Sequence, residues 1–529
     1  MKPDMFRSLS ALLENTASLL PDKEAVVYGD TRLTWGELNQ MVDNLACAFL
    51  EAGVAQGDCI GIISTTRPEY LCVFLAVARI GAVLVGFNTL YTAPEIVRLA
   101  HLTQPRIMVV VDELKGRPFA ESLITLFREF PFVEHTVVIG PQQPLGSRSF
   151  TDLAATPRRD LLPLLAERKA LIQPEDSVLM VFTSGSTGIP KGAVLTHRSV
   201  LTTTLVQVRE FMVLPDDRVL QNKPMSHVGG AINLTLPALA VGAALVFMDH
   251  FNPVRALEIV QKERITILAQ VPTMFIMELN LPEFEQYDLS SLRLAIVGGA
   301  ATPLPVMRQI MQITDTVITG YGMTETGGYI TFTRADDAPD TIAATVGKIA
   351  PEYEVQIVDE MRNPVPLGET GEVALRGHCL FKEYSENPQA TTEVFSADGW
   401  FFTGDVGYLD ARGYLTLVDR RKEMYISGGY NVYPREIELH IAQHPGIELV
   451  AVIGVDDPVM GEVGLACYTP VPGMNLPVDS LRSFCQAGLA EYKIPRHFIS
   501  MPSLPLTPLG KIDKPRLRQE LLANGYRTD

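Results

Sequence analysis

The stretch TSGSTGIPKG, residues 183–192, has a composition suited to holding phosphate. Its glycine, serine and threonine residues can turn backbone amides and hydroxyl groups toward phosphate oxygens, and Lys191 adds a positive charge. It follows SVLMVF, an apolar run that predicts a strand. The spacing differs from the GxxxxGK(S/T) pattern of the common ATPase and GTPase loop. By itself the stretch predicts either a phosphate-binding loop or an ordinary flexible connection.

A second polar cluster, TGYGMTET, follows the strand-like run DTVIT and contains Tyr321, Thr324 and Glu325. Loops of this kind commonly carry chemistry. A carboxylate beside a hydroxyl suits Mg²⁺ shared with nucleotide phosphates, because hard oxygen ligands bind that ion and the ion offsets the transferring charge. The alternative is a capped turn with a solvated glutamate.

Four further candidate sites give a weaker functional signal when each is considered alone. Asp405, in GWFFTGDVG, lies in a tight turn where a carboxylate could accept hydrogen bonds from ribose hydroxyls, or simply cap the turn. Arg420 and Lys422, in DRRKE, could hold sugar or phosphate, but such runs are more often solvated linker charge. His227, in NKPMSHVGG, and Lys511, in LPLTPLGKIDK, would ordinarily be a core histidine and a surface lysine.

The strands and helices that position these residues are predicted from alternating sequence patterns. The runs CIGIIS, RIMVVVD, HTVVIG, AALVFM, ITILAQVP and RLAIVGG are strand-like, and PVRALEIVQKER is helix-like. This alternation predicts an α/β fold of layered sheets with much parallel pairing. The apolar segment from Leu71 to Phe87 contains Arg79 and Gly81 and is shorter than the roughly 20 residues of a membrane span, which predicts a buried helix followed by a strand.

The pattern changes after about residue 355. YEVQIVD, GEVALRG, GWFFTGDVGYLD and GYLTLVD are short runs separated by glycine and aspartate, which predicts a small antiparallel β unit. After DRRKE, the remaining residues predict a compact α+β domain of about 100 residues. We therefore expect a large domain over 1–419, a boundary at 420–422 and a small domain over 423–529.

Composition restricts the class of protein. The chain has 529 residues, 47% of them hydrophobic, which is enough for several packed units. Its formal charge of −17 argues against a nucleic-acid partner and favours small-molecule chemistry. Six scattered cysteines without a CxxC pair predict neither a zinc site nor a disulfide framework, and the N-terminus lacks a signal-peptide core. We expect a cytoplasmic protein without an integral membrane segment.

The motifs gain specificity as an ordered set. TSGSTGIPKG, VGGAATP, YGMTET, FFTGD, DRRKEMYISGGYNVYP and LTPLGKIDK together resemble the core motifs of the AMP-forming adenylating enzymes, which include acyl-CoA synthetases, luciferases and peptide-synthetase adenylation domains. The resemblance extends from LTWGELNQ, near the start, to Lys511. It implies the fold of that family, a large N-terminal domain of two layered α/β sheets and a small β-barrel-like unit, followed by a small mobile C-terminal domain.

The resemblance also implies a reaction. A carboxylate attacks the α-phosphorus of ATP and releases pyrophosphate, and a thiol then attacks the acyl-adenylate and releases AMP. Lys511 would align the carboxylate with the α-phosphate, and Thr324, Glu325 and His227 would assist, with Glu325 and Thr187 near Mg²⁺. The implied ATP and AMP site comprises Thr183, Ser184, Gly185, Ser186, Thr187, Gly188, Lys191, Gly299, Ala300, Ala301, Tyr321, Gly322, Met323, Thr324, Asp405 and Arg420.

The second half-reaction implies rotation of the C-terminal domain about a hinge. Lys422 matches the hinge position, and Ser427, Gly428 and Gly429 would approach the pantetheine arm of coenzyme A. The free-standing chain favours coenzyme A over a carrier protein's phosphopantetheine or the oxygen used by luciferases. A scaffold that has lost its chemistry is a remote alternative, because the expected cations and carboxylates are all present.

The acyl pocket implied by the resemblance is built from His227, Val228, Gly229, Asn233, Thr273 and Gly327. Its glycines leave room, and no lysine or arginine lies within the stretches considered to pair with a second carboxylate. We therefore expect a medium- or long-chain fatty acid, or a cyclic or aromatic monocarboxylic acid. A homodimer is an expectation from the family alone.

Overall fold

The computed structural model describes residues 5–114, 116–183, 190–420, 423–427, 430–457, 459–474, 476–507 and 510–523. The chain divides into two compact units. The first comprises Met1–Leu268, Gly322–Ile330 and Gly377–Ser396, and the second comprises Ala269–Tyr321, Thr331–Arg376 and Ala397–Asp529. Both units mix helices and sheets, so the α/β fold class predicted from the sequence is confirmed.

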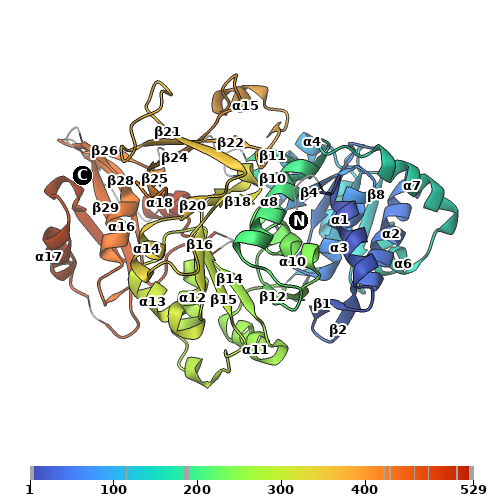
Figure 1. Ribbon diagram of the computed structural model, residues 1–529, viewed down its shortest axis with the longest axis horizontal. Helices are drawn as coiled ribbons and strands as arrows, with labels where there is room; N and C mark the ends of the chain where they lie inside the picture. Colours follow the sequence, from blue (N-terminus) through green and yellow to red (C-terminus); the bar gives the residue numbers. More distant parts are fainter. Residues whose placement is uncertain are drawn as a thin grey trace. The chain divides into compact units, whose positions relative to one another are not determined.

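An eight-stranded sheet forms the centre of the first unit (Figure 1). Its order is β23-β11-β10-β4-β3-β5-β8-β9, and pairing is parallel from β10 to β9. These strands are β3 (Cys59–Ile63), β4 (Val83–Phe87), β5 (Ile107–Val111), β8 (His135–Ile139), β9 (Arg148–Ser149), β10 (Ser177–Thr183), β11 (Lys191–Thr196) and β23 (Glu383–Tyr384). The central strands β4 and β5 are buried at every residue, as expected for parallel strands covered on both faces.

The same unit contains a second group of strands. β1 (Glu24–Tyr28) and β12 (Arg218–Gln221) both pair in parallel with β13 (Ala244–Phe247), and β2 (Thr31–Thr34) pairs antiparallel with β1. The helices of this unit are α1 (Leu9–Leu19), α2 (Trp35–Glu51), α3 (Pro68–Arg79), α4 (Ala93–Thr103), α5 (Ala120–Phe127), α6 (Phe150–Ala155), α7 (Leu162–Leu171), α8 (His197–Glu210), α9 (Val228–Ala231), α10 (Thr235–Val241), α11 (Pro253–Glu263) and α15 (Pro388–Val394).

The apolar segment from Leu71 to Phe87 forms α3 and then β4, as the sequence predicts. α3 packs against α1 and α2, which lie beside it in Figure 1. Arg79, at its end, is fully buried and is compensated by Asp43, whose Oδ1 lies 2.7 Å from Nη1, and by the side chains of Ser10 and Asn39. No helix of the described residues combines the length and apolarity needed to cross a membrane.

The second unit has smaller sheets. β15 (Leu294–Gly298) pairs in parallel with β16 (Val317–Gly320). A four-stranded antiparallel sheet, β21-β22-β24-β25, consists of Tyr353–Val358, Gly371–Gly377, Phe401–Leu409 and Leu415–Arg420, which are the four runs predicted after residue 355. Further along the chain, β26 (Tyr425–Ser427), β27 (Tyr430–Val432), β28 (Ile447–Asp457), β29 (Gly461–Pro470) and β30 (His497–Ser500) form one sheet.

The helices of the second unit are α12 (Pro272–Leu279), α13 (Leu304–Ile313), α14 (Pro339–Ala344), α16 (Pro434–Ile441), α17 (Val478–Gly488) and α18 (Lys514–Ala523). Two apolar clusters pack on β28 and β29, one including Val450 and Val452 and the other including Ala451 and Ile453. Because neighbouring residues of a strand face opposite sides, the sheet carries a core on each face. The domain boundary at 420–422 stays a prediction.

Candidate functional site

The predicted phosphate loop connects two paired strands. β10 and β11 are antiparallel, with Thr183 directly opposite Lys191, and the Thr183 hydroxyl donates to the Lys191 carbonyl at 3.4 Å. The antiparallel ladder therefore fixes Thr183 and Lys191, the two residues that flank the predicted loop. Ser184, Gly185, Ser186, Thr187 and Gly188 lie outside the described residues.

Tyr384 connects Lys191 with Glu325 in the first unit. The Lys191 ammonium lies 4.9 Å from the centre of the Tyr384 ring, and the Tyr384 hydroxyl donates to Glu325 Oε1 at 2.7 Å. β23, which carries Tyr384, reaches this position because it pairs with β11 through Ala193. Burial, together with the charge of Glu325, raises the pKa of Tyr384, so the phenol stays protonated and donates.

Glu325 is held in a short, buried turn. Thr324, Glu325 and Thr326 form a single 3₁₀ turn that ends at Gly327, whose φ is +63°. Glu325 is 5% exposed, and its carbonyl accepts the Phe381 backbone N–H at 2.7 Å. Gly322 and Met323, just before the turn, pair with Tyr329 and Gly328. The predicted metal carboxylate is thus fixed by main chain on both sides.

Several predicted acyl-pocket residues belong to the first unit. His227 precedes α9, and its Nδ1 accepts the Gly229 N–H at 3.0 Å. Val228 and Asn233 are buried, and the Asn233 side-chain oxygen accepts from Gln207 of α8 at 3.0 Å. A methyl group on Gly328 would lie 2.1 Å from that oxygen, so the glycine turn after Glu325 packs directly against Asn233.

Tyr321 and Asp405 are in contact in the second unit. The Tyr321 hydroxyl donates to Asp405 Oδ2 at 2.5 Å, and both residues are buried. Asp405 lies in β24, opposite Arg420 of β25 in the antiparallel ladder. The residues predicted to flank adenine and to hold ribose therefore lie side by side, although they are 84 positions apart.

Lys511 lies over the glycine predicted to contact adenine. A methyl group on Gly299 would be 2.9 Å from Lys511 Cε and 3.3 Å from its Nζ, so no larger side chain fits there without displacing the lysine. Gly299 also has a φ of +86°, which favours glycine. The loop that carries Lys511 is anchored because the Thr273 hydroxyl donates to the Gly510 carbonyl. Gly299 and Ala300, which follow the buried strand β15, are exposed, and Ala301 is half-buried.

The residues predicted for the coenzyme A step are only partly described. Lys422, Gly428 and Gly429 lie outside the described residues. Ser427 ends β26, is 4% exposed, and pairs with Tyr430 and Gly461 in the sheet. Lys514 was not anticipated from the sequence: its ammonium lies 2.7 Å from Glu423 Oε2 and 2.8 Å from Glu438 Oε1. It fixes the segment after the predicted hinge to α16 and α18.

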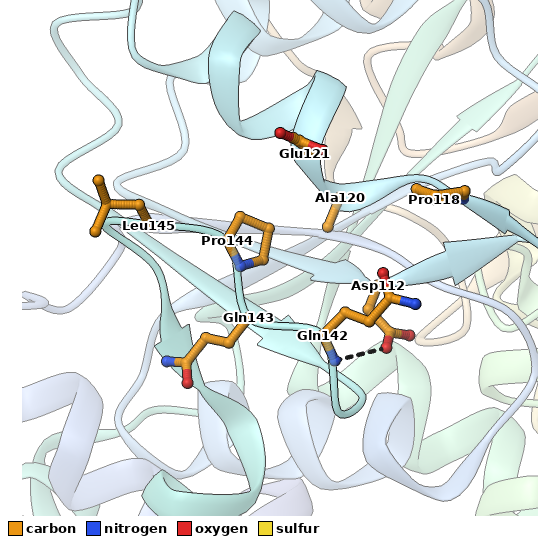
Figure 2. A pocket seen from close by; sticks show the side chains of 8 residues that line it. All are labelled: Asp112, Pro118, Ala120, Glu121, Gln142, Gln143, Pro144 and Leu145. Atoms are coloured by element: carbon orange, nitrogen blue, oxygen red, sulfur yellow. Dashed lines mark hydrogen bonds between the residues drawn. The ribbon is translucent and has the colours of Figure 1, made fainter.

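None of the predicted site residues in the described part of the chain lines a cavity of about 250 Å³ in the first unit, which is drawn in Figure 2. Its lining comprises Asp112, Pro118, Ala120, Glu121, Gln142, Gln143, Pro144 and Leu145. The Asp112 carboxylate accepts the Gln142 backbone N–H at 3.1 Å, the contact drawn in Figure 2. This carboxylate orders a turn, and the cavity has no place in the chemistry described above.

The buried carboxyl group of Glu278, on α12, is expected to make the stability of the folded protein depend on pH. It is 2% exposed, accepts from Gln270 at 2.7 Å, and burial raises its pKa to about 8. Between its unfolded pKa near 4.5 and about 8, the folded state holds a proton that the unfolded state has lost, so stability falls as pH rises. The Glu278→Gln variant has no titrating carboxyl group at this position, so it does not lose stability in this way as the pH rises. We expect its thermal stability relative to the natural chain to increase from about pH 5 to about pH 8, by up to about 1.4 kcal/mol per pH unit. Parallel melting curves over that range would contradict the assignment.

Comparison with known proteins identifies the family of the chain. Residues 13–385 match the family described as AMP-binding enzyme, and residues 436–511 match its C-terminal domain. A methyl-dioxo-octahydroindenyl-propanoyl:CoA ligase of Rhodococcus jostii is 36% identical over 96% of this chain and 98% of its own. The mitochondrial medium-chain acyl-CoA ligase ACSF2 of Homo sapiens is 31% identical over 97% of this chain and 88% of its own. The crystal structure of the anthranilate CoA ligase AuaEII with anthranoyl-AMP superposes with a TM-score of 0.90, at 27% identity, covering 99% of this chain and 100% of its own.

Proposed function

Because the chain belongs to the AMP-binding enzyme family, we propose that it is an AMP-forming acid–thiol ligase that activates a carboxylic acid with ATP and transfers the acyl group to coenzyme A. The observation that carries the mechanism is the position of Lys511 over Gly299. A lysine there lies beside backbone that the resemblance assigns to adenine. We assign its charge to bridging two anions, the substrate carboxylate and the α-phosphate.

In the first half-reaction a carboxylate oxygen forms a bond to the α-phosphorus, and the bond to the bridging oxygen of pyrophosphate breaks. Negative charge accumulates on the leaving pyrophosphate, so fixed cations and amide donors lower the barrier. We assign Lys511 to aligning the two anions, which otherwise repel each other. Lys191 and the hairpin loop hold the β- and γ-phosphates, and the Tyr321–Asp405 pair holds adenosine.

We assign Mg²⁺ to Glu325. A buried carboxylate fixed by its own turn and oriented by the Tyr384 hydroxyl offers the hard oxygen that this ion prefers. The adjacent Thr324 hydroxyl is of the same ligand class, and Thr187 is a further candidate from the sequence. The ion would offset charge on the phosphates. Tyr384 would thus support two of the assigned residues: it orients Glu325 through its hydroxyl and contacts Lys191 through its ring.

In the second half-reaction the thiol of coenzyme A attacks the acyl carbonyl, and AMP leaves with the bonding electrons. We assign the hinge role to Lys422 and the approach of the pantetheine arm to Ser427, Gly428 and Gly429. His227, which precedes α9 and accepts the Gly229 N–H, is one of the predicted acyl-pocket residues and is assigned to the carboxylate end of that pocket. A cytoplasmic location and a homodimer stay predictions.

For the substrate we propose a medium- or long-chain fatty acid, or a cyclic or aromatic acid. The relatives reported above are named for a medium-chain acid, a bicyclic acid and anthranilate, which is the range that the glycine-rich pocket allows. A panel of acids of increasing chain length and ring content tests the proposal through pyrophosphate release with and without coenzyme A. Release accompanied by thioester is expected. Release without thioester for every acid would favour a carrier protein as the acceptor.

Lys191→Ala is expected to separate the two half-reactions. It removes a cation from the phosphate loop while Thr183 and the hairpin ladder remain, so adenylation falls by about 10- to 100-fold. Thioester formation from preformed acyl-adenylate, which contains no pyrophosphate, stays within about threefold. Rapid-quench measurement of each half-reaction compares the two rates. Equal slowing of both would show that Lys191 does not act on the leaving group.

A further inference from the structure

Two buried polar residues, Asn222 and Lys223, follow β12. Asn222 is 4% exposed, and within the described part of the chain neither its side-chain oxygen nor its nitrogen has a hydrogen-bond partner. Lys223 is 8% exposed; burial lowers its pKa to about 8, with no contribution from a neighbouring charge in the described part of the chain. The buried Arg79, by contrast, is fully compensated by Asp43, Ser10 and Asn39.

These residues lie where the carboxyl ends of strands from both sheets of the first unit meet. Thr66, just after β3, donates its hydroxyl to the Lys223 carbonyl at 2.8 Å. At Gly86 of β4, an added methyl group would lie 2.6 Å from the Tyr70 hydroxyl and 3.0 Å from Ser226 Cα. The Tyr70 hydroxyl is also buried, and none of the described residues is its hydrogen-bond partner. In α/β proteins, ligands bind in the crevice at the carboxyl ends of parallel strands.

The side chain of Lys223 runs alongside the proposed acyl pocket. A methyl group on Gly229 would lie 3.9 Å from Lys223 Cδ and 3.2 Å from His227 Nδ1. The lysine stem and the histidine ring therefore both lie next to Gly229. Gly229, His227 and Ser226 are only half-buried, whereas Asn222 and Lys223 are more than nine-tenths buried. The polar pair thus lies deeper than the residues at the reacting end.

Leaving these groups unsatisfied is energetically unfavourable. A buried ammonium without a counter-charge, and a buried amide without hydrogen bonds, each lower stability relative to apolar residues of the same size. Native proteins keep such groups where a ligand or an ordered water completes them. The ammonium and the amide N–H are donors, which an oxygen acceptor complements, an anionic one most of all; the amide oxygen of Asn222 accepts and can be completed by an ordered water.

We propose that Lys223 and Asn222 form a polar subsite of the acyl pocket that binds an oxygen acceptor, a carbonyl or a carboxylate, carried by the substrate away from its reacting carboxyl group. This inference rests on the proposed ligase function and narrows the substrate class to oxygenated acids. It revises the expectation of a plain monocarboxylic acid, because that expectation assumed no lysine beside the pocket. Lys223 lies four positions before His227, outside the stretches that make up the predicted pocket.

The test compares acids of one chain length. Octanoate, a set of oxo-octanoates with the carbonyl at successive positions, and octanedioate are assayed for pyrophosphate release with the natural chain and with Lys223→Met. At least one oxygenated acid is expected to exceed octanoate in kcat/KM. Lys223→Met should lower kcat/KM for that acid by about 10- to 100-fold and leave octanoate within about threefold. The oxo acids and the dicarboxylate distinguish a carbonyl from a carboxylate ligand.

Two controls separate recognition from folding. Lys262→Met, at an exposed site on α11, should change neither selectivity nor stability. Lys223→Met should keep or raise the melting temperature, because it removes an uncompensated buried charge. Equal loss for all acids with a lowered melting temperature would overturn the subsite in favour of a structural lysine. Unchanged selectivity in Lys223→Met would overturn it as well.

A failure of the proposed ligase function would give a different experimental result from a failure of the proposed subsite. If the natural chain releases no pyrophosphate with any acid, the proposed reaction is contradicted, and the subsite is then judged by direct binding. Calorimetric titration with the oxo-octanoates, octanedioate and octanoate should show tighter binding of an oxygenated acid, lost in Lys223→Met. Equal binding of all acids by the natural chain and the variant would overturn the subsite independently of catalysis.

Discussion

Replacing Lys511 by alanine is expected to lower carboxylate-dependent ATP–pyrophosphate exchange by about 100- to 1,000-fold, the size of effect seen when one preorganised electrostatic group is removed. Lys511 lies next to Gly299, on a loop whose backbone is anchored to Thr273, and the lysine is half-buried. Alanine leaves the backbone contacts of that loop in place. The loss should therefore appear in kcat for exchange, with a small change in the KM for ATP.

Thioester formation provides the contrast for Lys511→Ala. Supplied with preformed acyl-adenylate and coenzyme A, the variant should form thioester within about threefold of the natural rate, because no anions need alignment at phosphorus in that step. Lys262→Ala, at an exposed site on α11, is the matched lysine control and should retain both activities. Full pyrophosphate exchange by Lys511→Ala would show that another residue aligns the two anions.

Glu325→Gln is expected to cause a loss of similar size, about 100-fold in adenylation, together with a higher Mg²⁺ concentration for half-maximal rate. The substitution keeps the shape of the side chain and an oxygen that accepts from Tyr384, but removes the negative charge that a divalent cation requires. Initial rates of pyrophosphate release over a range of Mg²⁺ concentrations measure both quantities.

Tyr384→Phe is the control that separates the effect of the Glu325 charge from the effect of how the Glu325 side chain is oriented. It removes the hydroxyl that donates to Glu325 and retains the ring beside Lys191. One hydrogen bond to a charged group corresponds to a loss of about 10-fold. We expect this smaller loss with little change in the Mg²⁺ requirement. A Glu325→Gln rate that rises to the natural level at high Mg²⁺ would support the metal role, and an unchanged Mg²⁺ dependence would contradict it.

Much of the fold could be predicted because its signals are local. The segment Leu71–Phe87 predicted a helix followed by a strand from its length, its apolar content and its interruption at Arg79 and Gly81, and α3 and β4 follow that prediction. The four runs after residue 355 likewise became β21, β22, β24 and β25. Within each element, the residue pattern and the conformation depend on neighbours close in sequence.

The sequence by itself determined the family chemistry, through motifs whose residue types and order match a phosphate loop, a metal carboxylate and a terminal lysine. Only the tertiary structure decided which side chains support them. Tyr384 reaches Lys191 and Glu325 because β23 pairs with β11, almost 200 positions away, and Lys223 lies beside Gly229 because of how the chain turns after β12. Contacts between distant segments depend on strand pairing and on packing at the ends of strands, which a local pattern of residues does not encode.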